Sequence, residues 1–323
     1  MIERYKVKVL HGGSLSSSEA IRLIQVNGVA LPYLIAAANH IRDTFNGSKI
    51  VLCGIVNARS GKCSEDCTFC AQSAHYKTDA AIYPLKKQNE ILKAAKNAEK
   101  AGSNCFSIVT SGKNAGFKGE FAEIKDAVGI LKKHTNMRRC TSLGTLTLEQ
   151  ARQLKKAGLQ RFHHNLETAR SFFKNVCTTH TYEERIETIK NAKAAGLEVC
   201  SGGIIGLGET AKQRVELACT LRDLNVDSVP INILNPIPGT PAAKLKKKIT
   251  PLEVLSTIAV FRFLMPKQDV VICGGREVNL RDLHSLVFWA GANGVLTGDY
   301  LTTKGRKPKA DVLLVNDLKL SIQ

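Results

Sequence analysis

KIVLCGIVN, residues Lys49–Asn57, is an apolar run of strand length. Seven further runs of this kind follow along the chain, at Asn104–Val109, Arg138–Ser142, Gln160–Asn165, Leu197–Gly202, Ser228–Leu234, Asp269–Cys273 and Gly294–Leu296. Short apolar runs that are bounded by turn residues predict strands buried on both faces. We therefore interpret all of these runs as strands of one sheet.

Helical patterns lie between these strands. They cover Asn89–Ala101, Phe121–His134, Leu148–Ala157, Tyr182–Ala195, Lys212–Leu224, Pro251–Met265 and Leu283–Ala292. Gly102, Gly158 and Gly196 each follow the last turn of a helical pattern, where glycine is the usual C-cap residue. Strands that alternate with helices form a parallel sheet, and about eight of them can close into a barrel. The sequence therefore predicts an α/β fold, a (β/α)8 TIM barrel.

We expect the barrel domain to cover residues 47–300. The preceding residues, 1–46, are predicted to form an N-terminal helical cap, because LSSSEAIRLI carries a capping box with Ser16 as N-cap and Glu19 three positions later. We expect this helix to cover the barrel floor. Residues 301–323 are interpreted as a short C-terminal tail made of a loop and a closing element. No internal repeat or low-complexity linker indicates a second domain.

GKCSEDCTFCAQS places Cys63, Cys67 and Cys70 in CxxxCxxC spacing after the first strand. In such a barrel the loops at the carboxyl ends of the strands build the active site. Three thiolates can bind three irons of a four-iron cluster and leave the fourth iron open to a substrate. The alternatives are a zinc site or buried thiols. Structural zinc takes four ligands, and His75 is the only nearby histidine, which disfavours zinc.

The cysteine motif is similar to that of the radical S-adenosylmethionine (SAM) enzymes, in which SAM chelates the open iron. Four strings follow it in order: RFHHNLET (Arg161–Thr168), TYEERIETI (Thr181–Ile189), EVCSGGIIGLGET (Glu198–Thr210) and SVPINIL (Ser228–Leu234). With them, the chain resembles the biotin synthase family from about Lys49 to Asp299. The resemblance implies a radical SAM enzyme that inserts sulfur from an auxiliary iron–sulfur cluster into dethiobiotin. It also implies a homodimer and a flavodoxin or ferredoxin as electron donor.

The resemblance assigns roles to single residues. The implied SAM contacts are Phe69 near the adenine, Glu167 at the ribose, Arg185 at the carboxylate, and the backbone of Gly203, Ile204 and Gly206. Asn165 and Asn232 match the asparagines that hydrogen-bond the ureido ring of dethiobiotin. Each assignment has a structural alternative: Arg185 could pair with Glu183 or Glu184 on its helix, the asparagines could cap strand ends, and the glycines could form an ordinary turn. His163 stands where the family more often has asparagine.

The auxiliary cluster site departs from the common pattern of three cysteines and an arginine. Cys140 and Cys200 match two ligand positions, but the other two positions fall on Ser107 and Val271. Cys105 and Cys273 lie two residues from these positions, and a shift of two keeps a side chain on the same face of a strand. We therefore expect Cys105, Cys140, Cys200 and Cys273 to hold an auxiliary cluster, of the four-iron type in preference to the two-iron type. Chance placement of buried cysteines is the alternative, and Cys53, Cys177 and Cys219 are interpreted as packing residues.

The chain carries 46 Lys and Arg against 28 Asp and Glu, a formal net charge of +18. Nucleic-acid binding has to be considered, but the lysines are spread over helical faces and aromatic residues make up only 6% of the chain, which disfavours it. A basic surface also suits an acidic electron donor. The N-terminus lacks the apolar core of a signal peptide, and no run has the length of a membrane span. Scattered single cysteines are typical of a reducing compartment, so we expect a cytoplasmic enzyme.

Two other functions remain open at this point. A related radical SAM enzyme, of the hydrogenase-maturation or methylornithine-forming kind, would share the first cysteine motif. It would not share Asn165, Asn232 and the auxiliary cysteines in these contexts. A metal-binding module that holds nucleic acid would bind it with a steep dependence on salt.

Overall fold

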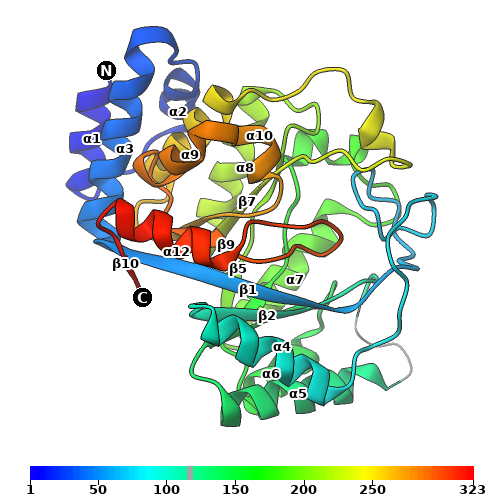
Figure 1. The fold of residues 1–323 in the computed structure, drawn as a ribbon. Helices are drawn as coiled ribbons and strands as arrows, with labels where there is room; N and C mark the ends of the chain where they lie inside the picture. Colours follow the sequence, from blue (N-terminus) through cyan, green and yellow to red (C-terminus); the bar gives the residue numbers. More distant parts are fainter. Residues whose placement is uncertain (115–118) are drawn as a thin grey trace.

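The computed structural model describes residues 1–114 and 119–323. Its parallel strands close into a barrel, because β1 pairs with β2 on one side and with β9 on the other. The barrel strands are β1 (Lys49–Arg59), β2 (Cys105–Thr110), β3 (Arg138–Ser142), β4 (Arg161–His163), β5 (Glu198–Cys200), β6 (Gly203–Ile205), β7 (Ser228–Ile233), β8 (Asp269–Ile272) and β9 (Gly294–Leu296). The fifth barrel position is shared by β5 and β6, which both pair with β7. The predicted (β/α)8 barrel is confirmed (Figure 1).

Helices between the strands form the outer layer. They are α4 (Gln88–Lys100), α5 (Glu120–His134), α6 (Leu148–Ala157), α7 (Tyr182–Ala194), α8 (Ala211–Asp223) and α9 (Pro251–Leu264). The last four begin at threonine N-caps with complete capping boxes, at Thr147, Thr181, Thr210 and Thr250. A threonine hydroxyl that accepts a hydrogen bond from the third helical N–H fixes the point where the helix begins.

Two sequence predictions need correction. The single helix predicted over Leu283–Ala292 is replaced by η4 (Arg281–Ser285) and α11 (Leu286–Trp289), which follow the short helix α10 (Arg276–Leu280). α11 ends at Trp289, and Gly291 has a φ of 103°, a conformation that does not continue a helix. The strand predicted over Leu197–Gly202 is present but shorter, because β5 ends at Cys200 and a separate strand, β6, begins at Gly203. At the break, a Cβ on Gly202 would lie 1.9 Å from the carbonyl oxygen of Pro230.

The N-terminal residues form α1 (Ile2–Leu10), α2 (Ser17–Ile24), η1 (Gly28–Ala30) and α3 (Leu31–Asn46). The predicted capping box is confirmed, since Ser16 Oγ accepts from Glu19 N at 3.2 Å and Glu19 Oε2 accepts from Ser16 N at 2.8 Å. α2 packs against α8 and α9, and α3 packs against α9 and α1. These helices therefore extend the outer layer beside α9 (blue in Figure 1).

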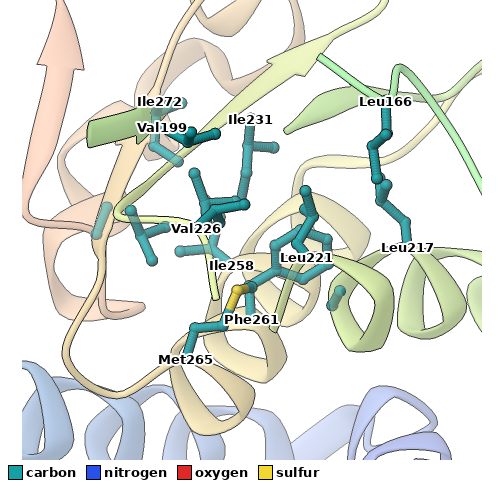
Figure 2. Close-up of a cluster of buried hydrophobic side chains, with 14 of the residues drawn as sticks. Leu166, Val199, Leu217, Leu221, Val226, Ile231, Ile258, Phe261, Met265 and Ile272 are labelled. Atoms are coloured by element: carbon teal, nitrogen blue, oxygen red, sulfur yellow. The ribbon is translucent and has the colours of Figure 1, made fainter. Parts of the chain in front are cut away.

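The apolar core lies between the barrel and the outer helices. Val199, Ile231 and Ile272 point outward from β5, β7 and β8, and Figure 2 shows them near Leu221 of α8 and Phe261 of α9. All five side chains are buried. Because side chains alternate along a strand, the residues directly before and after each of these positions face the barrel interior. The interior is therefore free for polar groups and thiols.

The C-terminal residues return to the barrel. After β9 the chain forms a loop, then α12 (Pro308–Asp317), and then β10 (Ser321–Ile322), which pairs in parallel with the start of β1. α12 is anchored by Asp311, whose Oδ2 accepts from Nη2 of the fully buried Arg276 at 2.7 Å. Over the described residues, no single helix has the length and apolarity to cross a membrane. The segments Ser17–Ile24 and Gly28–Asn46 reach that length and apolarity only when they are counted together, and they are bent by 116° relative to each other.

Candidate active site

A cavity of about 350 Å³ occupies the barrel interior. Every second residue of β4 and of the segment that follows it lines the cavity. These residues are Arg161 and His163 of β4, then Asn165 and Glu167. The residues between them face the outer helices, as Phe162 does. Because these four side chains occupy successive inward positions, they run from the interior of the barrel toward its carboxyl rim. Thiols line one part of the cavity, and amides, a carboxylate and glycines line another.

The loop after β1 carries the three-cysteine motif at this rim. Its turn is fixed by main-chain hydrogen bonds: Cys70 N donates to Cys67 O at 2.9 Å, and Cys63 N donates to Gln72 O at 3.0 Å. Cys67 is buried, whereas Cys63 and Cys70 are partly exposed. Phe69, between the last two cysteines, lines the cavity. Burial raises the pKa of Cys70 to about 11, so a thiolate there needs a bound cation.

A second loop holds the cysteine loop in place. Asp66 Oδ1 accepts from the backbone N–H of Thr178 at 2.9 Å and from that of Thr179 at 3.2 Å. Glu65 Oε2 accepts from Thr179 Oγ1 at 2.9 Å. Hydrogen bonds from the backbone and hydroxyls hold the pKa of Asp66 well below its usual range despite some burial. The two acidic residues of the motif therefore fix the loop, which leaves its thiols free to bind metal.

Cys67, Cys177 and His180 bring three possible metal-ligand atoms within 4.8 Å of one another. The hydrogen bonds of His180 argue against a single metal ion here. Arg185 Nε donates to His180 Nε2 at 3.0 Å, so Nε2 carries the lone pair, and Nδ1 carries the hydrogen that it donates to Glu65. A protonated Nδ1 has no lone pair for a metal. We interpret this group as a hydrogen-bonded clamp on the cysteine loop.

Arg185, Glu167 and Asn165 meet at the rim of the cavity. Arg185 Nη1 donates to the carbonyl oxygen of Asn165 at 2.8 Å and lies 3.7 Å from Glu167 Oε1. Asn165 Nδ2 donates to Glu167 Oε2 at 3.3 Å. Burial raises the pKa of Glu167, and the Arg185 guanidinium opposes that rise. The structure thus brings together three residues that the sequence assigned to SAM and substrate.

The alternative for Arg185, a surface pair on its own helix, is wrong. Arg185 is buried, and both neighbouring glutamates pair elsewhere. Glu183 pairs with Arg170, and Glu184 lies 2.9 Å from Lys113 Nζ. Arg185 is therefore directed into the barrel.

Gly203 begins β6 and Gly206 directly follows it, and Ile204 of this strand packs against the same buried cluster as Phe69 of the cysteine loop. A Cβ on Gly203 would lie 2.4 Å from the carbonyl oxygen of Glu167, so no other residue fits there. Gly206 has a φ of 92°, a conformation that favours glycine. Ile204 N donates to Glu167 O at 2.8 Å, which ties β6 to the end of β4, and the Ile204 side chain lines the cavity.

Asn232 faces the cavity from β7. Its Oδ1 accepts from Gly274 N at 3.1 Å, and its Nδ2 donates to Gly203 O at 3.4 Å. Asn165 Oδ1 accepts similarly from Gly202 N at 3.1 Å. These main-chain contacts fix the orientation of both amides inside the cavity, so each can present a donor and an acceptor to a ligand.

The four cysteines predicted to hold an auxiliary cluster all line the cavity. They are Cys105, Cys140, Cys200 and Cys273, and all are buried. Burial raises the pKa of Cys140 and Cys273, and raises that of Cys200 to about 12. Without a cation these three thiols stay protonated, and a bound iron–sulfur cluster would stabilise their thiolates. The pKa of Cys105 is lowered instead, chiefly by its neighbour Cys53. The donor set therefore fits an all-cysteine cluster.

Two cavity residues were missed by the sequence analysis. Cys53, interpreted as packing, lines the same cavity, and its β1 position pairs in register with Cys105 of β2. Arg161 lies beside these thiols with its side chain only 4% exposed, and it pairs with Asp269 at 3.1 Å. Its positive charge opposes the rise in pKa that burial imposes on Cys200. The alternation within RFHHN could have indicated that Arg161 shares the face of Asn165.

The loop after β9 covers part of the cavity mouth. Tyr300, Leu301, Thr302 and Thr303 line the cavity. The Tyr300 hydroxyl donates to Glu277 Oε1 at 2.7 Å, which holds the loop beside α10. Residues assigned to a C-terminal tail therefore contribute to the site.

Comparison with known proteins extends over nearly the whole chain. The Radical SAM superfamily model matches residues 58–221, and the Biotin and Thiamin Synthesis associated domain model matches residues 230–321. The chain is 50% identical over 320 residues to the biotin synthase of Geotalea uraniireducens, covering 99% of this chain and 97% of that protein. It is 50% identical over 316 residues to the biotin synthase of Geobacter sulfurreducens, covering 98% and 96%.

Solved structures share the fold. A methylornithine synthase superposes with a TM-score of 0.86 at 20% identity, covering 99% of this chain and 97% of that one. The FeFe-hydrogenase maturase HydG of Carboxydothermus hydrogenoformans gives 0.82 at 16% identity, covering 100% and 79%. At these identities the likeness concerns the fold alone.

The barrel, with its three-cysteine loop at the carboxyl rim, defines a radical SAM protein, which uses a four-iron cluster and SAM. At about half identity over almost its full length, the chain belongs to the biotin synthase family.

Proposed function

We propose that the protein converts dethiobiotin to biotin by radical SAM sulfur insertion. One observation carries this proposal. A single cavity is lined by three of the residues assigned to SAM (Phe69, Glu167 and Ile204), by the two anchored asparagines and by the buried thiols. When bound, the cofactors supply the 5′-deoxyadenosyl radical that removes hydrogen from the substrate, and the sulfur that replaces it. The chain's own residues bind, orient and shield the reactants.

The rim residues are proposed to bind SAM and its cluster. Cys63, Cys67 and Cys70 would hold the four-iron cluster and leave one iron for the amino and carboxylate groups of SAM. The residues proposed to contact SAM are Phe69, Glu167, Arg185, Gly203, Ile204 and Gly206. The buried guanidinium of Arg185 suits a carboxylate, and the close backbone of Gly203 leaves room for the nucleoside.

Asn165 and Asn232 are proposed to bind the ureido ring of dethiobiotin. Both amides face the cavity between the glycine rim and the thiols. Their anchoring to Gly202 N and Gly274 N supports this role, because an amide held in one orientation selects a ligand with matching donors and acceptors. A bound ring would then lie between the radical source and the sulfur source.

Cys105, Cys140, Cys200 and Cys273 are proposed to hold the auxiliary cluster that supplies sulfur. We favour a four-iron cluster over a two-iron cluster, because four cysteines are its ordinary ligand set. The neighbouring Arg161 supports the proposal, since its buried positive charge offsets the negative charge of an all-thiolate site.

The remaining proposals concern the electron donor, the oligomeric state, the cellular location and the domain boundaries. A flavodoxin or ferredoxin is proposed as the electron donor, supported by the net charge of +18, and nucleic acid is not proposed as a partner. We propose a homodimer in the cytoplasm, without membrane attachment. All ten cysteines are free thiols, which agrees with a reducing compartment. Residues 1–46, 47–300 and 301–323 are proposed as cap, barrel and tail.

The proposed function is tested by an anaerobic assay with SAM, dethiobiotin and dithionite. The wild-type chain is expected to form 5′-deoxyadenosine and biotin, and Cys67→Ala is expected to form neither. Cys219→Ala, which changes a half-buried thiol on α8 outside the cavity, serves as the matched control. Cleavage of SAM by Cys67→Ala would contradict the cluster assignment. SAM cleavage without biotin in the wild-type chain would instead favour a related radical SAM reaction.

A further inference from the structure

Cys53 lies at the same level of the barrel as one of the proposed auxiliary ligands. It pairs in register with Cys105 of the neighbouring strand. Neighbouring strands are about 4.8 Å apart, and paired residues of parallel strands point to the same face. Cys53 packs against a buried cluster that contains Cys105 and Cys140. β1 and β2 therefore present two adjacent sulfur atoms to the cavity.

The surroundings of Cys53 differ from those of a packing cysteine. Cys53 lines the same cavity as Cys140, Cys200 and Cys273 and is partly open to it. A thiol that only fills space is enclosed by apolar side chains. Cys219 shows the contrast, because it lies on the outer helix α8 and does not line this cavity. The cavity thus holds five thiols, whereas a four-iron cluster takes four cysteines.

We propose that Cys53 is a fifth thiol ligand of the auxiliary site and that it is interchangeable with Cys105 at one corner of the cluster. This inference rests on the proposed auxiliary cluster and concerns its ligand set. Cys140, Cys200 and Cys273 provide the other three corners. The register partners of Cys140 are Ser107 and Arg161, and those of Cys200 are His163 and Ser228, so neither has a cysteine beside it. Cys273 directly follows β8, which contains no other cysteine.

A spare thiol has a use at a site that gives up sulfur. If the cluster gave up a sulfide, Cys53 could take the open coordination position on the neighbouring iron, with its thiol proton released to solvent, which would keep the iron in the site. The Cys53–Cys105 pair is the one place in the described cavity where two cysteines from neighbouring strands meet in register.

Iron counting in a set of alanine variants tests the proposal. Cys53→Ala, Cys105→Ala and the double variant are reconstituted anaerobically, and iron and sulfide are counted and examined by Mössbauer spectroscopy. Two four-iron clusters give about eight irons per chain. Each single variant is expected to keep about eight irons with the wild-type Mössbauer spectrum. The double variant leaves one auxiliary iron without a cysteine, so it is expected to lose iron from that cluster or to show a changed iron subsite. The irons of the other cluster, bound by different cysteines, show that the double variant is folded.

Other outcomes would overturn the proposal in distinguishable ways. Loss of about four irons in Cys105→Ala alone would make Cys53 a packing residue, and the same loss in Cys53→Ala alone would make it the sole ligand. A double variant with full iron and the wild-type Mössbauer spectrum would remove both residues from the ligand set. Cys273→Ala and Cys219→Ala are the controls: the first is expected to lose auxiliary iron, and the second is expected to keep it. If the wild-type chain itself binds only about four irons, the auxiliary cluster is refuted, and the Cys53 proposal falls with it.

Discussion

Replacing Asn232 with alanine removes one of the two amides proposed to bind the ureido ring. In the free protein, Asn232 holds Gly274 N and Gly203 O through contacts of 3.1 and 3.4 Å. The variant therefore loses its polar contact with the ligand and also an anchor of the surrounding main chain. A buried polar group without its partner costs roughly 1–3 kcal/mol. The dissociation constant for dethiobiotin should rise roughly 5- to 150-fold.

Anaerobic calorimetry in the presence of SAM measures this affinity directly. A second measurement follows the ratio of biotin formed to 5′-deoxyadenosine formed. A substrate that is held loosely presents its carbons to the radical less often, so this ratio should fall in Asn232→Ala. Asn316→Ala, an exposed change on α12, is the matched control and should leave both quantities unchanged. Wild-type affinity and ratio in both Asn232→Ala and Asn165→Ala would refute the substrate assignment.

Three further predictions follow from other parts of the structure. Cys273→Ala should lose auxiliary iron and biotin formation yet still cleave SAM, as measured by iron content and 5′-deoxyadenosine; wild-type biotin yield would contradict the ligand assignment. Asp311→Ala removes the carboxylate that pairs with the buried Arg276 at 2.7 Å and leaves Glu277, at 3.5 Å, as its acidic neighbour. It should lower the free energy of unfolding by roughly 3 kcal/mol in denaturant titration, whereas an unchanged midpoint would show that the pair is dispensable. Thr210→Ala removes the N-cap of α8 and should cost roughly 0.5–2 kcal/mol in the same titration; no loss would show that the cap is redundant.

The barrel was predictable because its pattern is local. Each strand is a short apolar run, and each helix has its own period, so the alternation is visible in the sequence. The fifth strand was predicted as continuous because nothing local shows that Gly202 passes close to Pro230 O. The break there depends on β7, which is remote in the sequence. The helix predicted over Leu283–Ala292 failed for a related reason, because an apolar period does not show that its first residues form a 3-10 helix or that Gly291 has a positive φ.

The site was predictable where side-chain alternation or family resemblance named its residues. Cys105 and Cys273 were placed on the inner face by a shift of two positions, and both line the cavity. Cys53 was missed because its significance comes from its partner: only the register of β1 against β2 places it beside Cys105. The role of Arg161 also depends on remote residues, since its partner Asp269 lies on β8. The alternation of side chains in the sequence predicts which face of a strand a residue occupies. Only the register between two strands shows which residues lie beside it.

The pairing of β10 with the start of β1 has a consequence for the order of events during synthesis. β1 leaves the ribosome before the other barrel strands, but its β10 partner, Ser321–Ile322, is made after all of them. Asp311, which anchors α12 to Arg276, is also a late residue. The loop that lines the cavity mouth lies between β9 and α12, and Tyr300 also holds it to Glu277, so it gains its last anchor only when these late segments dock. Until then the mouth is less firmly covered, and this interval would allow metal and sulfide to enter.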